Sequence, residues 1–426
     1  MNLGEWHMAN QNRGGGFLLW GITWASSKLR NRKIRKFNTQ ARGVKQLSGI
    51  TVDYLFPPNS YRDNIVISGG SSGDRVRFCE KILQDACTQK RAVIVLTSGN
   101  FGLANTIYQG GLGTVVNNQN KVFDAFMFLE LQDICRVVFD TDSQKYNIQP
   151  SGRYILQIVH EILQAQNLKP YFSNFANFDY HKISASINQC LLGGLINQIK
   201  ANDLNSFLAM GQSEISKIDS FFYDAKIQFA GISSPNPNST GAMSALSAIW
   251  NNQICLIDVG GVHNSFLFDL IINSLFVANE KGLEYTLLID DIPASSPALQ
   301  SILQSKSNNN NIICTNDAFV MLGGSERNFS NMVGVADKTV LLSHGSHISC
   351  EMWSKYIGQY EKIDTSRSSG GGWLQSSRWG YMNKQSQTEA MKREHKIKPE
   401  EIADLGQNQV IVYENRGSEL YKANMQ

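Results

Sequence analysis

A glycine-rich turn near the start of the chain contains residue types that could bind phosphate. Residues 68–75 read Ser-Gly-Gly-Ser-Ser-Gly-Asp-Arg and follow a short apolar run at residues 64–67. Phosphate loops use glycines so that backbone N–H groups converge on the anion, a Lys for the terminal phosphates and a Ser or Thr hydroxyl for Mg²⁺. The candidate nucleotide-binding residues are Gly69, Gly70, Ser71, Ser72, Gly73, Asp74 and Arg75.

Two residues of this turn depart from the chemistry of a working phosphate loop. Gly73 matches the last glycine, but Asp74 occupies the Lys position and Arg75 the Ser/Thr position. Like charges about 4 Å apart repel by roughly 4 kcal/mol at an effective dielectric constant near 20, so Asp74 would oppose a phosphate. Three interpretations stay open: Arg75 or Arg77 supplies a displaced positive charge, nucleotide binds without turnover, or the turn binds no ligand.

Paired acids end a second apolar run. Residues 286–289 are Thr-Leu-Leu-Ile, and Asp290 and Asp291 follow them. ATPases place an acid at the end of a strand near the phosphate loop, where it holds Mg²⁺ and orients water. Asp290 and Asp291 are therefore the catalytic candidates, although Ile254–Asp258 is another apolar run that ends in an acid. No metal is expected beyond magnesium with the nucleotide, because the histidines of residues 344–347 are interpreted as part of a surface loop.

Positive charge is concentrated before the glycine-rich turn. Residues 1–52 contain nine Lys or Arg and one acid, whereas the whole chain has a formal net charge of only +3. Six of these cations fall within nine residues: Lys28, Arg30, Arg32, Lys33, Arg35 and Lys36. Cations this close repel one another unless a polyanion is near, which favours contact with nucleic-acid phosphates or membrane headgroups. The alternative is a solvated linker helix.

Alternating strand and helix patterns predict the framework that positions these residues. A strand, the turn, a helix from residue 75 to about 89 and a strand at 92–96 form a βαβ unit. Strand patterns return at residues 254–258, 285–291, 311–314 and 338–342, after a mostly helical stretch. The predicted fold class is α/β, a RecA-like P-loop NTPase domain with an inserted all-helical domain.

The domain boundaries follow from the same patterns. Residues 1–60 are expected to form a basic N-terminal arm or linker, 61–150 the first part of the RecA-like domain, 151–245 the all-helical insertion and 246–426 the second part. Seven scattered cysteines without a CxxC pair favour reduced thiols in a cytoplasmic protein. The chain has no run of about 18 apolar residues, so no transmembrane segment is expected.

The order of these motifs resembles that of type IV secretion coupling proteins, the VirD4/TraG/TraD family of FtsK/HerA-like P-loop ATPases. Residues 287–293 look like the family's apolar run with Asp-Glu-Phe-Pro, and residues 399–405 and 409–413 resemble its closing segment. The resemblance implies ATP and magnesium as cofactors, a homo- or hetero-oligomeric ring, and contact with secretion channel proteins and DNA or protein cargo. It also implies a position peripheral to the inner membrane.

The departures from the family pattern all fall on catalytic positions. Besides Asp74 and Arg75, Asn316 lies in the segment where the family has its sensor glutamine, and residues 306–309 lack the trans-acting arginine. The resemblance with these departures implies a pseudo-ATPase kept for assembly or cargo recognition, acting beside an active paralogue. The alternatives are an active DNA-pumping ATPase with a non-standard phosphate loop and a non-catalytic scaffold or packaging subunit.

Overall fold

The structure is a computed structural model of the 426-residue chain. It contains a smaller unit of residues 1–45 and 353–398 and a larger unit of residues 46–352 and 399–426. The residues described are 17–142, 145–233, 241–260, 265–292, 297–304, 309–369, 385–415, 417 and 419–426. Among them, no helix combines the length and the apolar character needed to cross a membrane.

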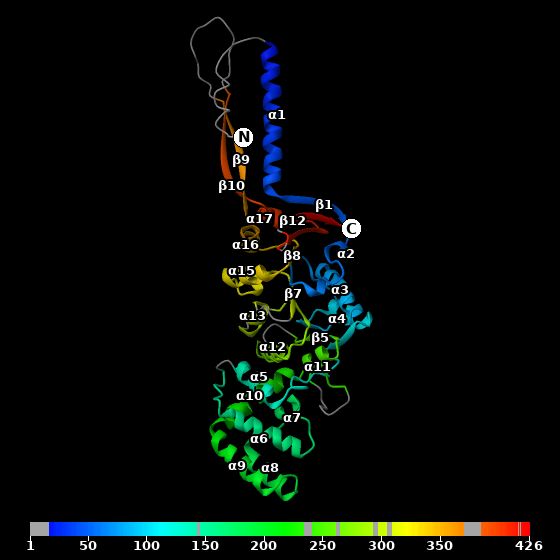
Figure 1. The fold of residues 1–426 in the computed structure, drawn as a ribbon, viewed down its shortest axis with the longest axis vertical. Coiled ribbons are helices and arrows are strands. Elements are labelled where there is room, and N and C mark those ends of the chain that lie inside the picture. Colours follow the sequence, from blue (N-terminus) through cyan, green and yellow to red (C-terminus); the bar gives the residue numbers. More distant parts are fainter. Residues whose placement is uncertain are drawn as a thin grey trace. The chain divides into compact units, whose positions relative to one another are not determined.

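A ten-stranded sheet is the framework of the larger unit (Figure 1), with the order β1-β12-β11-β8-β2-β7-β6-β3-β5-β4. Its parallel strands are β8 (Lys338–Leu341), β2 (Ile65–Ser68), β7 (Asn310–Thr315), β6 (Thr286–Asp290), β3 (Val93–Thr97), β5 (Ile254–Asp258) and β4 (Gly113–Val116). Antiparallel strands β11 (Gln409–Glu414) and β12 (Glu419–Met425) extend it toward β1 (Val44–Ile50).

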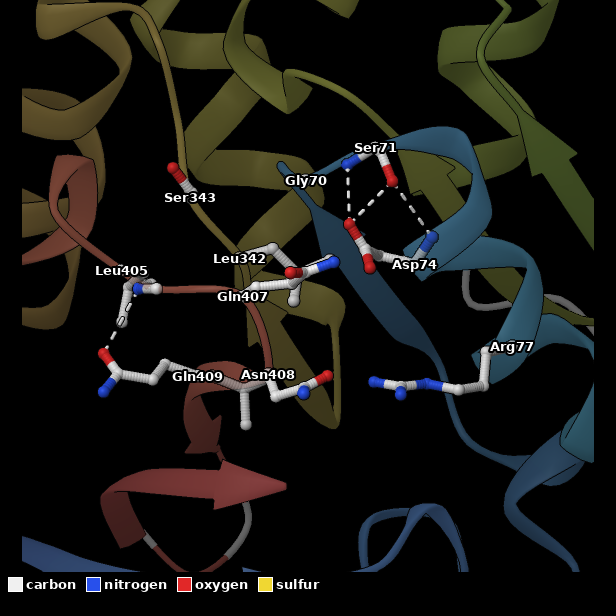
Figure 2. A pocket seen from close by; sticks show the side chains of 12 residues that line it. Gly70, Ser71, Asp74, Arg77, Leu342, Ser343, Leu405, Gln407, Asn408 and Gln409 are labelled. Atoms are coloured by element: carbon white, nitrogen blue, oxygen red, sulfur yellow. Dashed lines mark hydrogen bonds between the residues drawn. The ribbon is translucent and has the colours of Figure 1, made fainter. Parts of the chain in front are cut away.

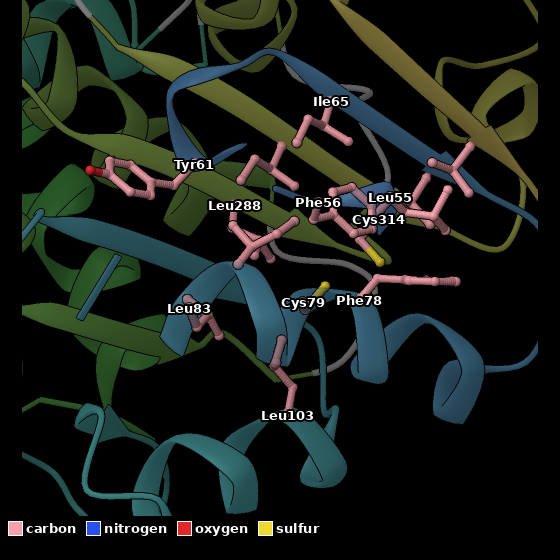
Figure 3. Packing of buried hydrophobic residues seen from close by; sticks show 14 of the residues in the cluster. Leu55, Phe56, Tyr61, Ile65, Phe78, Cys79, Leu83, Leu103, Leu288 and Cys314 are labelled. Atoms are coloured by element: carbon pink, nitrogen blue, oxygen red, sulfur yellow. The ribbon is translucent and has the colours of Figure 1, made fainter. Parts of the chain in front are cut away.

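The central strands are buried along their whole length. This holds for β2, β3 and β6, as expected for a parallel sheet that is covered on both faces. Helix α3 (Ser72–Thr88) packs Phe78 and Cys79 into the same core as Leu288 of β6 and Cys314 of β7 (Figure 3). This packing fixes the helix that follows the glycine-rich turn.

Further helices connect the strands of the sheet or flank them. They are α2 (Val52–Leu55), α4 (Phe101–Gln109), α11 (Ala245–Trp250), α12 (Ser265–Glu280), α13 (Pro297–Gln304), α14 (Ala318–Met321), α15 (Glu326–Val335), α16 (His347–Ile357) and α17 (Pro399–Ala403).

Between β4 and β5 the chain forms a group of helices. They are α5 (Leu131–Asp142), α6 (Gly152–Ala165), α7 (Phe172–Ala176), α8 (Ile183–Leu192), α9 (Gln198–Gly211) and α10 (Ile215–Phe229). Aromatic rings hold this group together: Phe222 of α10 stacks on Phe175 and Tyr180 and meets Phe126 edge-on. The group belongs to the same compact unit as the sheet.

The smaller unit combines one long helix with a two-stranded ribbon. Helix α1 (Phe17–Arg42) lies along the antiparallel strands β9 (Gln359–Ser369) and β10 (Gln385–His395). The Asn38 side chain donates to the Ile363 carbonyl at 3.0 Å and accepts from its N–H at 2.9 Å. Two segments thus group differently from the boundaries drawn on the sequence: residues 353–398 join the N-terminal helix, and β1 enters the sheet.

Candidate nucleotide site

The carboxyl edge of the sheet brings the glycine-rich turn and the paired acids together, as expected from the sequence. Strand β7 lies between β2 and β6, with Ser68 in register with Thr315 and Asp290 in register with Cys314. Parallel strands end at one edge of the sheet, and ligands of open α/β sheets bind outside that edge. The turn after β2 and the acids after β6 therefore face a common space, and Arg75 spans it.

The first half of the turn is closed onto neighbouring backbone. Gly69 and Gly70 have φ values of 98° and 66°, which favour glycine. Their N–H groups donate to Thr315 O at 3.0 Å and Ser343 O at 2.8 Å. A Cβ on Gly69 would lie only 2.7 Å from the carbonyl oxygens of Leu342 and Ser343. Two N–H groups that could have bound a phosphate are therefore used inside the protein.

Asp74 binds the start of its own helix (Figure 2). Its Oδ2 accepts from the Ser71 hydroxyl at 2.7 Å and the Ser71 N–H at 3.1 Å, while the Asp74 N–H donates to Ser71 Oγ. This is a capping box, with Ser71 as the N-cap residue of α3. The Ser71 hydroxyl bond is the main cause that lowers the pKa of Asp74, so the carboxylate is charged at neutral pH. An anion from the chain itself occupies the N-terminus of α3, where a phosphate would bind.

Arg75 fills the space beneath the turn. Its side chain is only 2% exposed and donates to Gly69 O at 3.1 Å and Gly70 O at 2.8 Å. The same guanidinium forms an ion pair with Asp291. A magnesium ion bound by Asp291 would have to displace this buried cation.

The two acids are held by different partners. Asp290 is 1% exposed and accepts from Thr97 Oγ1 at 2.9 Å and from Asn100 Nδ2 at 2.7 Å, and burial raises its pKa. Asp291 has a left-handed backbone with φ 50°, and its Oδ1 accepts from the N–H of Asn316 at 2.7 Å. The bond from Asn316 is a backbone one, so it does not depend on the side chain of the sensor-like residue.

Ser68 and His344, for which the sequence predicted no role in this site, support the turn. His344 Nδ1 faces Leu342 O at 2.8 Å and carries the proton, so Nε2 accepts from the Ser68 hydroxyl at 2.9 Å. Ser68 Oγ in turn accepts from Ala318 N at 3.1 Å. The prediction that His344 lies in a surface loop is wrong, because its side chain is 3% exposed. Burial lowers its pKa and keeps it neutral. The sequence did contain a signal for Ser68, because it is a polar residue at the end of an apolar strand.

A cavity of about 370 Å³ opens beside the turn, on the side of β8 and β11. Figure 2 shows Arg77 reaching from α3 toward Asn408 across it. The Arg77 guanidinium contacts Met425 Sδ at 3.7 Å and the ring of Phe78, and no bond from it to the turn is present among the described residues. The cavity is lined by Gly70, Ser71, Asp74, Arg77, Leu342, Ser343, Leu405, Gly406, Gln407, Asn408, Gln409 and Val410.

Other residues singled out on the sequence fall elsewhere. The six clustered cations lie on α1 of the smaller unit. Pro293 and residues 306–308, where the family has its trans-acting arginine, lie outside the described residues.

The fold and the site together define the class of architecture: an α/β, RecA-like domain with an all-helical domain, in which Asp74 and Arg75 bind within the glycine-rich turn. No protein-family model and no curated protein sequence matches the chain. Solved structures of the plasmid coupling protein TrwB do match. The complex with the ATP analogue ADPNP has 13% sequence identity and a TM-score of 0.54, covering 92% of this chain and 91% of that chain.

The complex of TrwB with ADP and Mg²⁺ is similar to the same degree, with 12% identity, a TM-score of 0.54 and coverage of 92% of this chain and 91% of that chain. VirB4 of Thermoanaerobacter pseudethanolicus matches more weakly, with 12% identity, a TM-score of 0.38 and coverage of 69% and 80%. At such identities the likeness to TrwB concerns the fold alone. The predicted fold class, α/β with a RecA-like domain and an all-helical domain, is confirmed.

Proposed function

We propose that this chain is a catalytically silent relative of the type IV secretion coupling ATPases, which recruits or helps to move DNA or protein cargo. The observation that carries the proposal is the self-occupied turn. Asp74 binds the start of α3 and Arg75 pairs with Asp291, so both charges are engaged within the protein. The likeness to TrwB, described as a bacterial conjugative coupling protein, supports the choice of family.

Hydrolysis of ATP needs a cation at the terminal phosphates, a metal ion and a positioned water molecule. Here the carboxylate of Asp74 repels phosphate oxygens, and the guanidinium of Arg75 points to Asp291 and to two turn carbonyls. A nucleotide that enters the site therefore binds weakly and without turnover.

Nucleotide titration of designed variants tests the proposal. Asp74→Lys combined with Arg75→Thr restores the family chemistry and should raise the affinity for ATP with Mg²⁺ above that of the wild type. Asp74→Lys alone, which keeps the Arg75–Asp291 pair, should give a smaller gain. Gln84→Lys is a matched control, because it adds one positive charge at an exposed position of the same helix. Unchanged affinity in all folded variants would mean that the turn is not built for phosphate.

The partners follow from the proposed family. We propose a homo- or hetero-oligomeric ring, docked on secretion channel proteins and containing an active paralogue, with the helices of residues 151–245 receiving the cargo. The chain would act in the cytoplasm, peripheral to the inner membrane, with the basic helix α1 facing a polyanion. Sedimentation velocity of the chain alone and with an active paralogue tests the ring: a monomer under both conditions would contradict it.

A further inference from the structure

The smaller unit as a whole carries more positive charge than its N-terminal segment alone. Residues 1–45 and 353–398 contain 18 Lys or Arg and 5 Asp or Glu, a formal charge of +13. The rest of the chain contains 21 Lys or Arg and 31 Asp or Glu, a formal charge of −10. The fold therefore gathers basic residues from two distant parts of the sequence into one unit, which suits a polyanionic surface.

Helix α1 joins an apolar segment and a cationic segment on one axis. The helix is continuous over Phe17–Arg42, so residues 17–25, which read Phe-Leu-Leu-Trp-Gly-Ile-Thr-Trp-Ala, lead directly into the cations of residues 28–36. At about 1.5 Å per residue, each nine-residue segment is roughly 14 Å long. The hydrocarbon core of a bilayer is about 30 Å thick, so the apolar segment could enter one leaflet and not cross it.

The cations of α1 face solvent. All six of them are exposed. Two apolar neighbours are exposed as well: Leu29, between Lys28 and Arg30, is 59% exposed, and Phe37, after Lys36, is 42% exposed. Arg30 pairs with Glu389 at 2.8 Å. In the part of the smaller unit that the structure describes, no acid pairs with Arg32, Lys33, Arg35 or Lys36.

The ribbon pairs one of its acids, Glu389, with Arg30, and two others with its own lysines. Its acids Asp364 and Glu394 are paired with Lys392 at 3.0 Å and Lys362 at 3.1 Å. The helix is held to the ribbon by Asn38, through Ile363, and by Arg42, which donates to Lys396 O at 2.6 Å. The unit thus presents a fixed row of charge that is available to an external anion.

We propose that α1 docks the smaller unit on an anionic phospholipid surface, with residues 17–25 entering the headgroup–acyl boundary and residues 28–36 binding headgroup phosphates. A bilayer offers hydrocarbon and phosphate within the length of one helix, whereas nucleic acid offers phosphate but no place for the apolar segment. Trp20 and Trp24 are of the residue type that membrane interfaces favour. This docking deepens the peripheral position given under the proposed function, and it does not depend on the state of the nucleotide site.

Vesicle co-sedimentation of the full chain tests the proposal. We expect binding to vesicles of phosphatidylcholine with about one third phosphatidylglycerol, weakening as salt rises, and little binding to pure phosphatidylcholine. Changing Arg32, Lys33, Arg35 and Lys36 to Gln should lower partitioning on the order of 100-fold or more, because each cation near the surface contributes roughly fivefold. Trp20→Ser with Trp24→Ser should weaken binding but preserve its salt dependence.

A matched control removes four exposed cations of the larger unit: Lys121, Lys169, Lys226 and Arg327, each changed to Gln. This variant should bind vesicles as the wild type does. Equal binding to neutral and anionic vesicles, or full binding by the α1 variant, would overturn the proposal. Salt-dependent binding to a DNA duplex without binding to vesicles would also overturn it and assign the helix to nucleic acid. ATP turnover is measured in a separate assay. A negative result in the vesicle test therefore does not contradict the proposal that the nucleotide site is silent.

Discussion

At the scale of single residues, Arg75 holds the candidate site together. Its buried guanidinium satisfies two turn carbonyls and pairs with Asp291. Removing one partner of a buried charge pair leaves the other uncompensated, which makes such losses larger than those of surface pairs. At the position where a phosphate loop has a hydroxyl for a metal, this chain has a cation that pairs with Asp291.

Arg75→Met should therefore lower the free energy of unfolding by about 2–3 kcal/mol, below the full cost of a buried pair because Asp291 is partly exposed. Arg75→Lys should recover only part of this, since an ammonium group lacks the planar fork that reaches three acceptors at once. Urea denaturation measures both. A loss below about 0.5 kcal/mol in Arg75→Met would show that the pair contributes little.

Unlike the Arg75–Asp291 pair, the buried carboxylate of Asp290 lowers the free energy of unfolding at neutral pH. Burial raises its pKa above the ordinary value of 3.8, so the folded protein binds this proton more tightly than the unfolded chain does. Ionised Asp290 therefore costs stability: the cost is absent below the ordinary pKa, grows as pH rises from the ordinary pKa to the folded pKa, and stays constant above it. Asp290→Asn should be more stable than the wild type at pH 7, by about 1.4 kcal/mol for each unit of the shift, and equally stable near pH 3. Thermal or urea unfolding at the two pH values measures this, and a destabilised variant at pH 7 would contradict it.

At the scale of elements, the start of α3 shows how the turn is fixed. The N-cap bonds between Ser71 and Asp74 hold the first turn of the helix and the second half of the loop together. The bond to Ser71 lowers the pKa of Asp74, so this stabilisation is present above the ordinary pKa of 3.8 and is lost as pH falls through the folded pKa.

Ser71→Ala should thus lower the free energy of unfolding by about 1 kcal/mol at pH 7, the usual loss for a helix cap. The loss should be smaller at acidic pH. Ser72→Ala is the matched control, because Ser72 is the next residue, inside the helix, and is not the cap. Urea denaturation at both pH values gives the comparison. Equal losses in the two variants would show that the cap is not what holds the turn.

The sequence predicted the buried strands because they are apolar runs on both faces. β5 was placed at its observed bounds, and β2, β6 and β7 within one residue at each end. It gave no signal for β9 and β10, whose residues are mostly polar, as in Gln359–Ser369, and which pair outside the main sheet. The turn and the acids were located correctly at one edge. The pairing of Arg75 with Asp291 joins residues 216 positions apart, and only the folded sheet brings them together.

At the scale of the whole molecule, the sheet and helices form a RecA-like α/β framework, while the glycine-rich turn is closed by its own side chains. The fold is that of TrwB over most of the chain. The central strands β2, β3 and β6 are fully buried. Charge is divided between the two units, with the smaller one strongly basic. This combination is the one expected if the function proposed above is right.

A steady-state ATPase assay of the purified chain with Mg²⁺, with and without added DNA, tests the central claim most directly. The closed turn predicts turnover below about 0.1 per second, far under the range of 1–1000 per second that enzymes commonly reach, and no change on Asp290→Ala. Turnover above that rate that disappears in Asp290→Ala would contradict the account, because it would mean that the turn opens and that Asp290 serves an active site.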